Sequence, residues 1–217
     1  MEIEKKQATS SMVNLLIPEP IENLQLPAPE LLNYYKNLEN RILWMDMDVD
    51  DMFLEFGKYI VMWNQEDAGK PKEERKPIKL FFFSPGGSLY INNAMVDIIK
   101  ASKTKIIGIN MGMAYSAGCF MYLACHERVA MPSATFLIHK GSGEFHGTFD
   151  EISSQINEYT RQIDELEEYV KANTKITQDI LDEKFGTEWY ITAQEAVKLG
   201  VCDKIITDID QLFLPAN

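Results

Sequence analysis

A serine at position 116 lies where the sequence allows a tight, exposed turn. Ser116 stands between an expected strand and an expected helix, and its near neighbours are small: Ala114, Ala117 and Gly118. Small neighbours let the backbone turn sharply and leave a hydroxyl accessible, as they do around a nucleophilic serine. The G-x-S-x-G pattern is not met, because Ala114 fills the position two before the serine. Serine is also a common helix N-cap, so Ser116 alone fits either role.

His139 is the histidine placed best to act as a general base. It follows the apolar segment TFLI and precedes Lys140-Gly141, and loops that follow strands commonly carry catalytic side chains. Taken alone, a histidine at this position more often has a structural role. His126 is expected at the surface end of a helix, and His146 is expected in a solvated loop.

Two adjacent glycines follow the apolar segment at 78–83, in the sequence Ser84-Pro85-Gly86-Gly87. The N–H groups of such a loop can form an oxyanion hole or bind a phosphate, although a plain tight turn has the same composition. The loop matches neither a Walker A motif nor a G-x-G-x-x-G motif. Together with the serine and the histidine, it supplies what acyl transfer needs: an oxyanion donor, an attacking oxygen and a base.

The elements that must hold these groups alternate between strands and helices. Hydrophobic spacing and turn residues predict helices at 29–38, 49–63, 91–99, 116–125, 149–172, from 177, and at 192–200. Strands are predicted at 41–45, 78–83, 104–109, 129–131, 135–138, 189–191 and 202–206, with a turn at Gly112, a polar linker at 64–77 and a loop at 140–147. This alternation indicates one α/β domain with a mostly parallel sheet at 29–217, preceded by a proline-containing N-terminal arm at 1–28.

The helix at 149–172 is unusually long and has a regular apolar side. A capping box at Thr148 to Glu151 opens it, and a second box at Thr192 to Glu195 opens the last predicted helix. Steps of four and three residues predict an apolar seam for a partner, within the chain or between chains: Ile152, Ile156, Tyr159, Ile163, Leu166 and Val170.

Composition excludes several classes of protein. Of the 217 residues, 46% are hydrophobic and 25% are charged, which argues against a disordered or fibrous chain. A formal net charge of −12 repels phosphate backbones and argues against nucleic-acid binding. The three cysteines form no C-x-x-C pair, and the acidic run MDMDVDD lacks the glycine and the closing glutamate of an EF-hand. We therefore expect neither a disulfide scaffold nor a metal site.

One uncharged stretch, between Lys105 and His126, is long enough to cross a membrane. Because it contains Asn110, Ser116 and several glycines, we predict a buried strand, a turn and a buried helix instead. The first ten residues carry mixed charge and no apolar region, so a secretory signal is not expected. These features favour a soluble, cytoplasmic protein without a membrane partner.

Four segments resemble the Clp protease proteolytic subunit (ClpP) family: FFFSPGGSLY, MGMAYSAGCFMYLA, MPSATFLIHKG and WYITAQEAVKLGVCDKI. The resemblance extends over residues 38–207. It implies a ClpP/crotonase-like superhelix of βαβ units with a protruding handle helix. It also implies a serine endopeptidase with Ser116 as nucleophile, His139 as base, and Glu188 as the third member of the triad. The resemblance assigns the oxyanion hole to Gly87 and Ala117, and substrate binding to Gly86.

The family usually has aspartate where Glu188 stands, and Asp179 and Asp182 are the alternatives on the preceding helix. The resemblance implies no cofactor or metal, and polypeptide substrates. It also implies a heptameric ring, stacked on a second ring through the helix at 149–172, and a separate AAA+ unfoldase as partner. The long arm, the linker at 64–77 and Phe83, where asparagine is common, depart from the family pattern.

Three other functions are compatible with the same sequence. A non-catalytic ring subunit would pair with an active paralogue. A capsid-maturation protease of phage type would share the family's chemistry. An acyl-CoA hydratase or thioesterase of the crotonase type would use the glycine loop on a thioester carbonyl and would not need Ser116 and His139.

Overall fold

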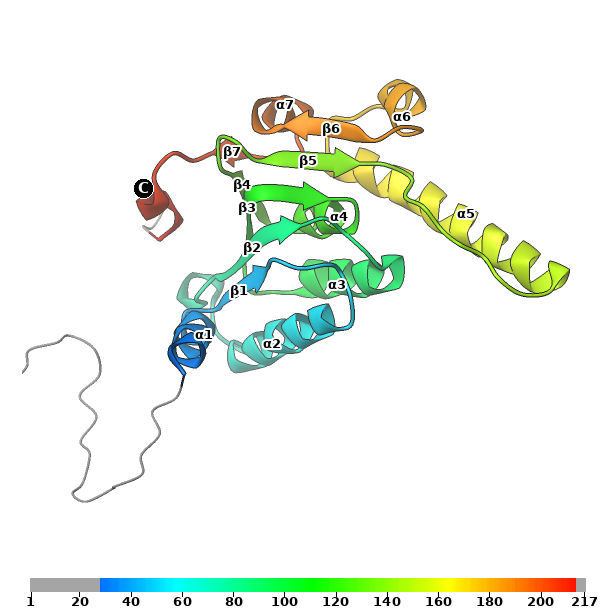
Figure 1. The fold of residues 1–217 in the computed structure, drawn as a ribbon. Coiled ribbons are helices and arrows are strands. Elements are labelled where there is room, and N and C mark those ends of the chain that lie inside the picture. The colour runs from blue at the N-terminus through cyan, green and yellow to red at the C-terminus, as the bar shows by residue number, and fades with distance from the viewer. Residues whose placement is uncertain (1–27, 214–217) are drawn as a thin grey trace, which may run out of the picture.

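The computed structural model describes residues 28–213 and has a seven-stranded sheet flanked by helices (Figure 1). The helices are α1 (Pro29–Glu39), α2 (Met52–Glu66), α3 (Leu89–Ala101), α4 (Ala117–Leu123), α5 (Phe149–Asn173), α6 (Gln178–Lys184) and α7 (Ala193–Leu199). The strands are β1 (Ile42–Met45), β2 (Ile78–Ser84), β3 (Ile106–Tyr115), β4 (Glu127–Ala130), β5 (Thr135–Ile138), β6 (Trp189–Thr192) and β7 (Lys204–Ile205). Two short 3₁₀ helices are η1 (Lys72–Glu74) and η2 (Ile209–Leu212). The predicted N-terminal arm at 1–28 lies outside the described residues, apart from Ala28.

The sheet has the strand order β1-β2-β3-β4-β7, and β5 pairs with both β3 and β6. All of these pairings are parallel except that of β5 with β6. The predicted α/β class with a mostly parallel sheet is therefore confirmed. Parallel strands point their carboxyl ends toward one edge of the sheet, where loops of successive units meet.

Strand β3 connects the two parts of the sheet. Its residues 107–110 pair with β4, and its residues 113–115 pair with β5. The predicted end of this strand at Ile109 and the predicted turn at Gly112 are therefore wrong. Gly112 has another role, because a Cβ atom there would lie 2.7 Å from Cε2 of Phe83. The continued strand brings the backbone to the start of α4.

Helices α2, α3 and α4 lie next to one another along the sheet and enclose the main core (Figure 1). Four apolar residues of α2 that share one side of the helix are buried: Phe53, Phe56, Ile60 and Trp63. Every residue of α4 is buried as well. The uncharged stretch at 105–126 is thus a core strand and a core helix. Among the helices of residues 28–213, none combines the length and the apolar character needed to span a membrane.

Helix α5 begins with the predicted capping box and is unevenly packed. Its C-terminal half contacts the body of the domain through Ile163, Leu166 and Val170, which are buried. Its N-terminal half projects away from the sheet, as Figure 1 shows, and Phe149 is 84% and Ile156 45% exposed. The predicted seam therefore serves the chain's own core only along its second half.

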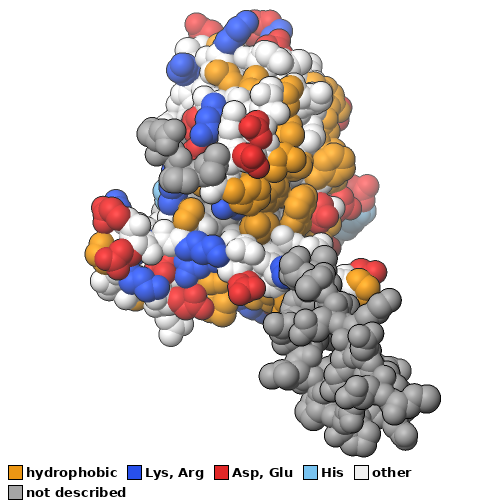
Figure 2. Space-filling view, turned by 90° about the vertical axis from the view of Figure 1, so that its left-hand side faces the viewer, with side chains coloured by type: hydrophobic (Ala, Val, Ile, Leu, Met, Phe, Trp, Pro, Cys, Tyr) orange, Lys and Arg blue, Asp and Glu red, His pale blue; other side chains and the backbone are white. Residues whose placement is uncertain are grey.

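The opposite face of the sheet carries a smaller apolar cluster of Phe81, Ile109, Val129, Ile206 and Leu212. Trp44 stacks on Phe81 with ring centroids 4.6 Å apart and is still 41% exposed. Figure 2 shows hydrophobic side chains gathered on the side of the molecule that lies left in Figure 1. In the single chain, this side presents apolar surface to the outside.

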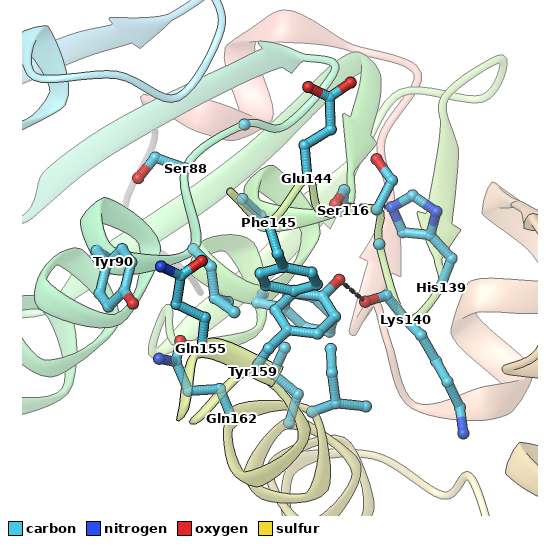
Figure 3. A pocket seen from close by; sticks show the side chains of 18 of the residues that line it. Ser88, Tyr90, Ser116, His139, Lys140, Glu144, Phe145, Gln155, Tyr159 and Gln162 are labelled. Carbon is cyan, nitrogen blue, oxygen red and sulfur yellow. Dashed lines mark hydrogen bonds between the residues drawn. The ribbon is translucent and has the colours of Figure 1, made fainter. Parts of the chain in front are cut away.

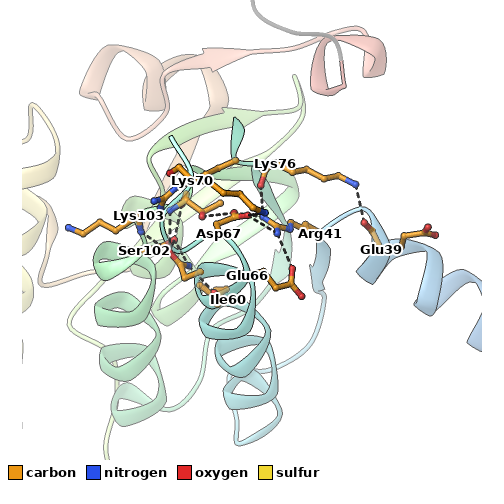
Figure 4. Close-up of polar contacts among 12 residues, drawn as sticks. Glu39, Arg41, Ile60, Glu66, Asp67, Lys70, Lys76, Ser102 and Lys103 are labelled. Carbon is orange, nitrogen blue, oxygen red and sulfur yellow. Dashed lines mark hydrogen bonds and ion pairs between the residues drawn. The ribbon is translucent and has the colours of Figure 1, made fainter. Parts of the chain in front are cut away.

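A buried ion pair ties the start of β1 to the end of α2 (Figure 4). The Arg41 guanidinium donates to Asp67 Oδ2 at 2.5 Å and to Oδ1 at 3.1 Å, and Thr104 donates to Oδ2 at 2.9 Å. Arg41 is 7% and Asp67 1% exposed. Hydrogen bonds from Arg41 above all hold the pKa of the Asp67 carboxyl well below its usual value. The segment predicted as a linker at 64–77 thus begins with the last turn of α2 and a structural anchor.

We expect Asp67→Asn to lower the free energy of unfolding by about 3–5 kcal/mol, because it leaves the buried Arg41 charge poorly compensated. Urea unfolding at neutral pH measures this loss. Since the folded-state pKa of Asp67 is depressed, its contribution to stability is complete above the pKa of an unfolded aspartate. The contribution disappears as the pH falls through the folded-state pKa.

Glu66→Gln is the matched control, because Glu66 also accepts a hydrogen bond from Arg41, at 3.0 Å, but its side chain is 52% exposed. An ion pair with such an exposed partner contributes about 0–1 kcal/mol. Equal losses for Asp67→Asn and Glu66→Gln would contradict the assignment of the anchor to Asp67.

Candidate active site

Ser116 sits at the junction of β3 and α4 in a strained backbone conformation. Its φ is 52° and its ψ is −123°, which a residue other than glycine rarely adopts. The surrounding backbone holds this conformation: the Ser116 N–H donates to Leu137 O at 2.9 Å, and its carbonyl accepts from the N–H of Cys119 and Phe120. The Ser116 side chain makes no capping hydrogen bond to α4. The hydroxyl is thus not used as a helix cap.

Gly86 lets the glycine loop approach Ser116 closely. Its φ is +102°, and a Cβ atom there would lie 2.7 Å from Ser116 Cβ and 2.8 Å from Tyr115 O. Both distances are far below normal contact, so only glycine fits. The Gly86 N–H donates to Ser84 Oγ at 3.3 Å and its carbonyl accepts from Val49 at 2.8 Å. Its backbone groups therefore bond within the protein.

Gly87, in the glycine loop, and Ala117, the first residue of α4, are the two residues expected to form the oxyanion hole. Gly87 forms a parallel bridge with Val49, and a Cβ on Gly87 would lie 2.5 Å from Val49 O. Within residues 28–213, the N–H groups of Gly87 and Ala117 donate to no other group. Both residues line the cleft that contains Ser116. Unpaired backbone N–H groups in a cleft that also contains a serine hydroxyl are compatible with an oxyanion hole.

His139 lies directly after β5 and contacts the serine. Its Nε2 is 2.8 Å from Ser116 Oγ. When the hydroxyl donates to Nε2, the proton of the neutral ring is on Nδ1. Partial burial lowers the pKa of His139, and the negative charge of Glu188 opposes this effect. A neutral histidine hydrogen-bonded to a serine hydroxyl can accept its proton.

The pairing of β5 with β6 brings Glu188 close to His139. In the antiparallel pair of β5 and β6, Ile138 is opposite Trp189, so His139 and Glu188 follow at the same end of the two strands. Glu188 is exposed, and its Oε2 accepts a hydrogen bond from Tyr190 at 3.0 Å. No hydrogen bond joins Glu188 to His139 in the part of the chain that the structure describes.

The two alternative acids, Asp179 and Asp182, both lie on α6. Asp182 accepts a hydrogen bond from Gln178 at 2.9 Å. Of the acids in the described ranges, Glu188 is the one whose charge acts on the pKa of His139. Glu188 therefore has the better position for an electrostatic partner of the histidine.

The site opens into a cleft of about 580 Å³ between the glycine loop and α5 (Figure 3). Part of its lining is apolar: Leu89, Phe120, Ile163 and Leu166. The loop after His139 borders the opening, and Tyr159 donates to Lys140 O at 2.8 Å while Phe145 packs edge-on against the Tyr159 ring. The sequence did not lead us to expect that α5 lines the cleft. The apolar seam of α5 was the signal from which this could have been predicted.

The remaining reactive residues lie elsewhere. Nδ1 of His126 accepts the Ile106 N–H at 3.0 Å, so this histidine holds the start of β3. His146 is exposed, near Glu144. The three cysteines are buried and unpaired. Among residues 28–213, no cluster of histidine, cysteine and acidic side chains is arranged to bind a metal ion.

The chain is similar to known Clp protease subunits. The family model described as Clp protease matches residues 30–209. The ATP-dependent Clp protease proteolytic subunit of Deinococcus radiodurans is 26% identical over 175 residues, which cover 80% of this chain and 83% of that protein. Subunit 2 of the Pseudomonas aeruginosa enzyme is 30% identical over 143 residues, 65% of this chain and 71% of the relative.

The solved structure of a ClpP1 mutant from Listeria monocytogenes has the same fold. It superimposes with a TM-score of 0.70 at 21% sequence identity, over 83% of this chain and 99% of that chain. The expected superhelix of βαβ units with a long protruding helix is therefore confirmed.

Proposed function

Because the chain belongs to the Clp protease family, we propose that it is a serine endopeptidase in which Ser116, His139 and Glu188 form the catalytic triad. The observation that carries this proposal is the 2.8 Å contact between His139 Nε2 and Ser116 Oγ, at a serine whose backbone is strained and whose hydroxyl caps no helix. Residues 29–217 are proposed as the protease domain.

The proposed reaction proceeds by acyl transfer. His139 takes the hydroxyl proton while Ser116 Oγ attacks a peptide carbonyl carbon, and the N–H groups of Gly87 and Ala117 stabilise the resulting oxyanion. His139 then gives the proton to the leaving amine, and water hydrolyses the acyl-enzyme. The negative charge of Glu188 stabilises the imidazolium that forms in each step.

The proposed substrates are polypeptides bound along the cleft. Its apolar wall fits a hydrophobic side chain next to the scissile bond. Gly86 contributes by its shape, because it lets the loop that carries Gly87 lie against Ser116. The chemistry uses no metal ion or cofactor.

The proposed assembly is a heptameric ring, stacked on a second ring through α5 and served by an AAA+ unfoldase. The exposed apolar residues at the start of α5 support a contact with another subunit. ATP would belong to the unfoldase. A cytoplasmic location is proposed with it.

The proposal is tested by labelling the purified full-length protein with a fluorophosphonate, which reacts with activated serines, and locating the adduct by mass spectrometry. We expect one adduct on Ser116 and none in His139→Ala, because the hydroxyl needs the base to become nucleophilic.

Other outcomes would favour the competing functions. A folded protein without any adduct would support a non-catalytic ring subunit. Saturable hydrolysis of a CoA thioester that survives Ser116→Ala would support a crotonase-type enzyme.

A further inference from the structure

Glu188, directly before β6, is held by Tyr190, which stands two positions later on that strand. Residues i and i+2 of a strand project to the same side, and the Tyr190 hydroxyl donates to Glu188 Oε2 at 3.0 Å. The Tyr190 ring packs edge-on against Tyr115, with ring centroids 5.5 Å apart. Tyr115 in turn bonds the Thr135 hydroxyl at 2.7 Å. The carboxylate is thus linked to β3, the strand that ends directly before Ser116.

An exposed glutamate needs such a restraint to act on a histidine. Its side chain has one more rotatable bond than aspartate, and water competes for both oxygens. The backbone fixes only where Glu188 begins, through the pairing of β6 with β5. A phenol that donates to one carboxylate oxygen fixes the direction of the group and leaves the second oxygen free to accept the Nδ1–H of His139.

We propose that Tyr190 is a positioning residue that orients the Glu188 carboxylate toward His139. The inference rests on the proposed function, because it concerns the acid of the same triad. Tyr190 contacts no reacting atom in this scheme and acts only through Glu188.

Few other charged groups compete for the histidine. Lys140, the next residue along the chain, pairs with Glu167 of α5 at 3.4 Å. Tyr159 of α5 donates to the Lys140 carbonyl, and Glu144 lies at the mouth of the cleft with its side chain 92% exposed. The hydrogen bond to Glu188 raises the pKa of Tyr190, so the phenol keeps its proton across the neutral range.

The test is Tyr190→Phe, which keeps the ring and its contact with Tyr115 but removes the hydroxyl. We expect kcat for a fluorogenic peptide to fall about tenfold, the value of one hydrogen bond to a charged group. We also expect the acid limb of the pH–rate profile to move to lower pH. The reason is that the Glu188 charge raises the pKa of His139, and a carboxylate that turns away raises it less.

Two further variants make the result specific. Tyr35→Phe removes an exposed hydroxyl on α1, far along the chain from the site, and should leave kcat and the pH profile unchanged. In a Glu188→Gln background, Tyr190→Phe should have little additional effect, because its partner charge is already gone. The proposal is overturned if Tyr190→Phe lowers kcat by the same factor in the parent protein and in Glu188→Gln. It is also overturned if Tyr190→Phe raises kcat.

Fluorophosphonate labelling separates this inference from the function on which it rests. If Ser116 is labelled in the parent protein but Tyr190→Phe behaves like the parent, the positioning role is wrong and the peptidase stands. If Ser116 is not labelled in the parent protein, the triad and the role of Tyr190 are both rejected.

Discussion

Replacing Ser116 by alanine is expected to reduce kcat for peptide hydrolysis by a factor of about 10⁴ to 10⁶, the range covered by the loss of single triad members. The substitution removes the attacking oxygen but leaves the backbone of the turn and both N–H donors in place. A residual rate above that of the uncatalysed reaction in water should therefore remain, because the oxyanion hole and substrate binding still contribute. Continuous hydrolysis of a fluorogenic peptide measures the loss.

The loss should not come from unfolding. The Ser116 side chain makes one hydrogen bond in the described structure, to His139, so Ser116→Ala should unfold at nearly the same urea concentration as the parent. Ser133→Ala, in the exposed turn between β4 and β5, should keep full activity. In the double variant Ser116→Ala/His139→Ala, the two reductions in kcat should not multiply, because the Ser116 and His139 side chains act as one unit. Reductions in kcat that multiply would contradict a Ser116–His139 pair.

The second large effect is expected for Gly86→Ala. The new Cβ would meet Ser116 Cβ at 2.7 Å and Tyr115 O at 2.8 Å, so either the serine or the glycine loop must move. Displacing an oxyanion donor or a nucleophile by about 1 Å costs about 10²–10³ in rate. We expect a decrease of that size in kcat, and weaker fluorophosphonate labelling of Ser116.

Gly69→Ala provides the matched control. Gly69 also has a positive φ, +82°, but no atom lies within 4 Å of the position that its Cβ would take. Gly69→Ala therefore has the same backbone penalty as Gly86→Ala, about 1 kcal/mol, but creates no clash. Full activity in Gly69→Ala and strongly reduced activity in Gly86→Ala would assign the effect to the contact with Ser116. Equal activities of Gly69→Ala and Gly86→Ala would reject this assignment.

Local patterns predicted most of the fold and part of the site. Hydrophobic spacing and capping boxes depend on neighbouring residues, and they located α5 and α7 within about a residue. The small residues around Ser116 indicated a tight turn, and the position of His139 after a strand indicated a base. Both signals are visible in a short stretch of sequence.

The features that sequence reasoning missed depend on distant partners. Strand β3 continues beyond Gly112 because β5 offers it a second partner, which no local pattern announces. The Arg41–Asp67 pair joins segments that look unrelated, a strand start and a polar linker. The link from Tyr190 to Glu188 acquires meaning only after β6 is paired with β5.

The antiparallel pairing of β5 with β6 also sets the order in which the proposed machinery is completed. The proposed nucleophile and base directly follow β3 and β5, but their acid comes directly before β6, after α5 and α6 have been made. During synthesis, amino-terminal parts fold first. A nascent chain on the ribosome would thus carry a serine and a histidine without their carboxylate until β6 emerges. The proposed peptidase would therefore gain full activity only after β6 has been made and has paired with β5.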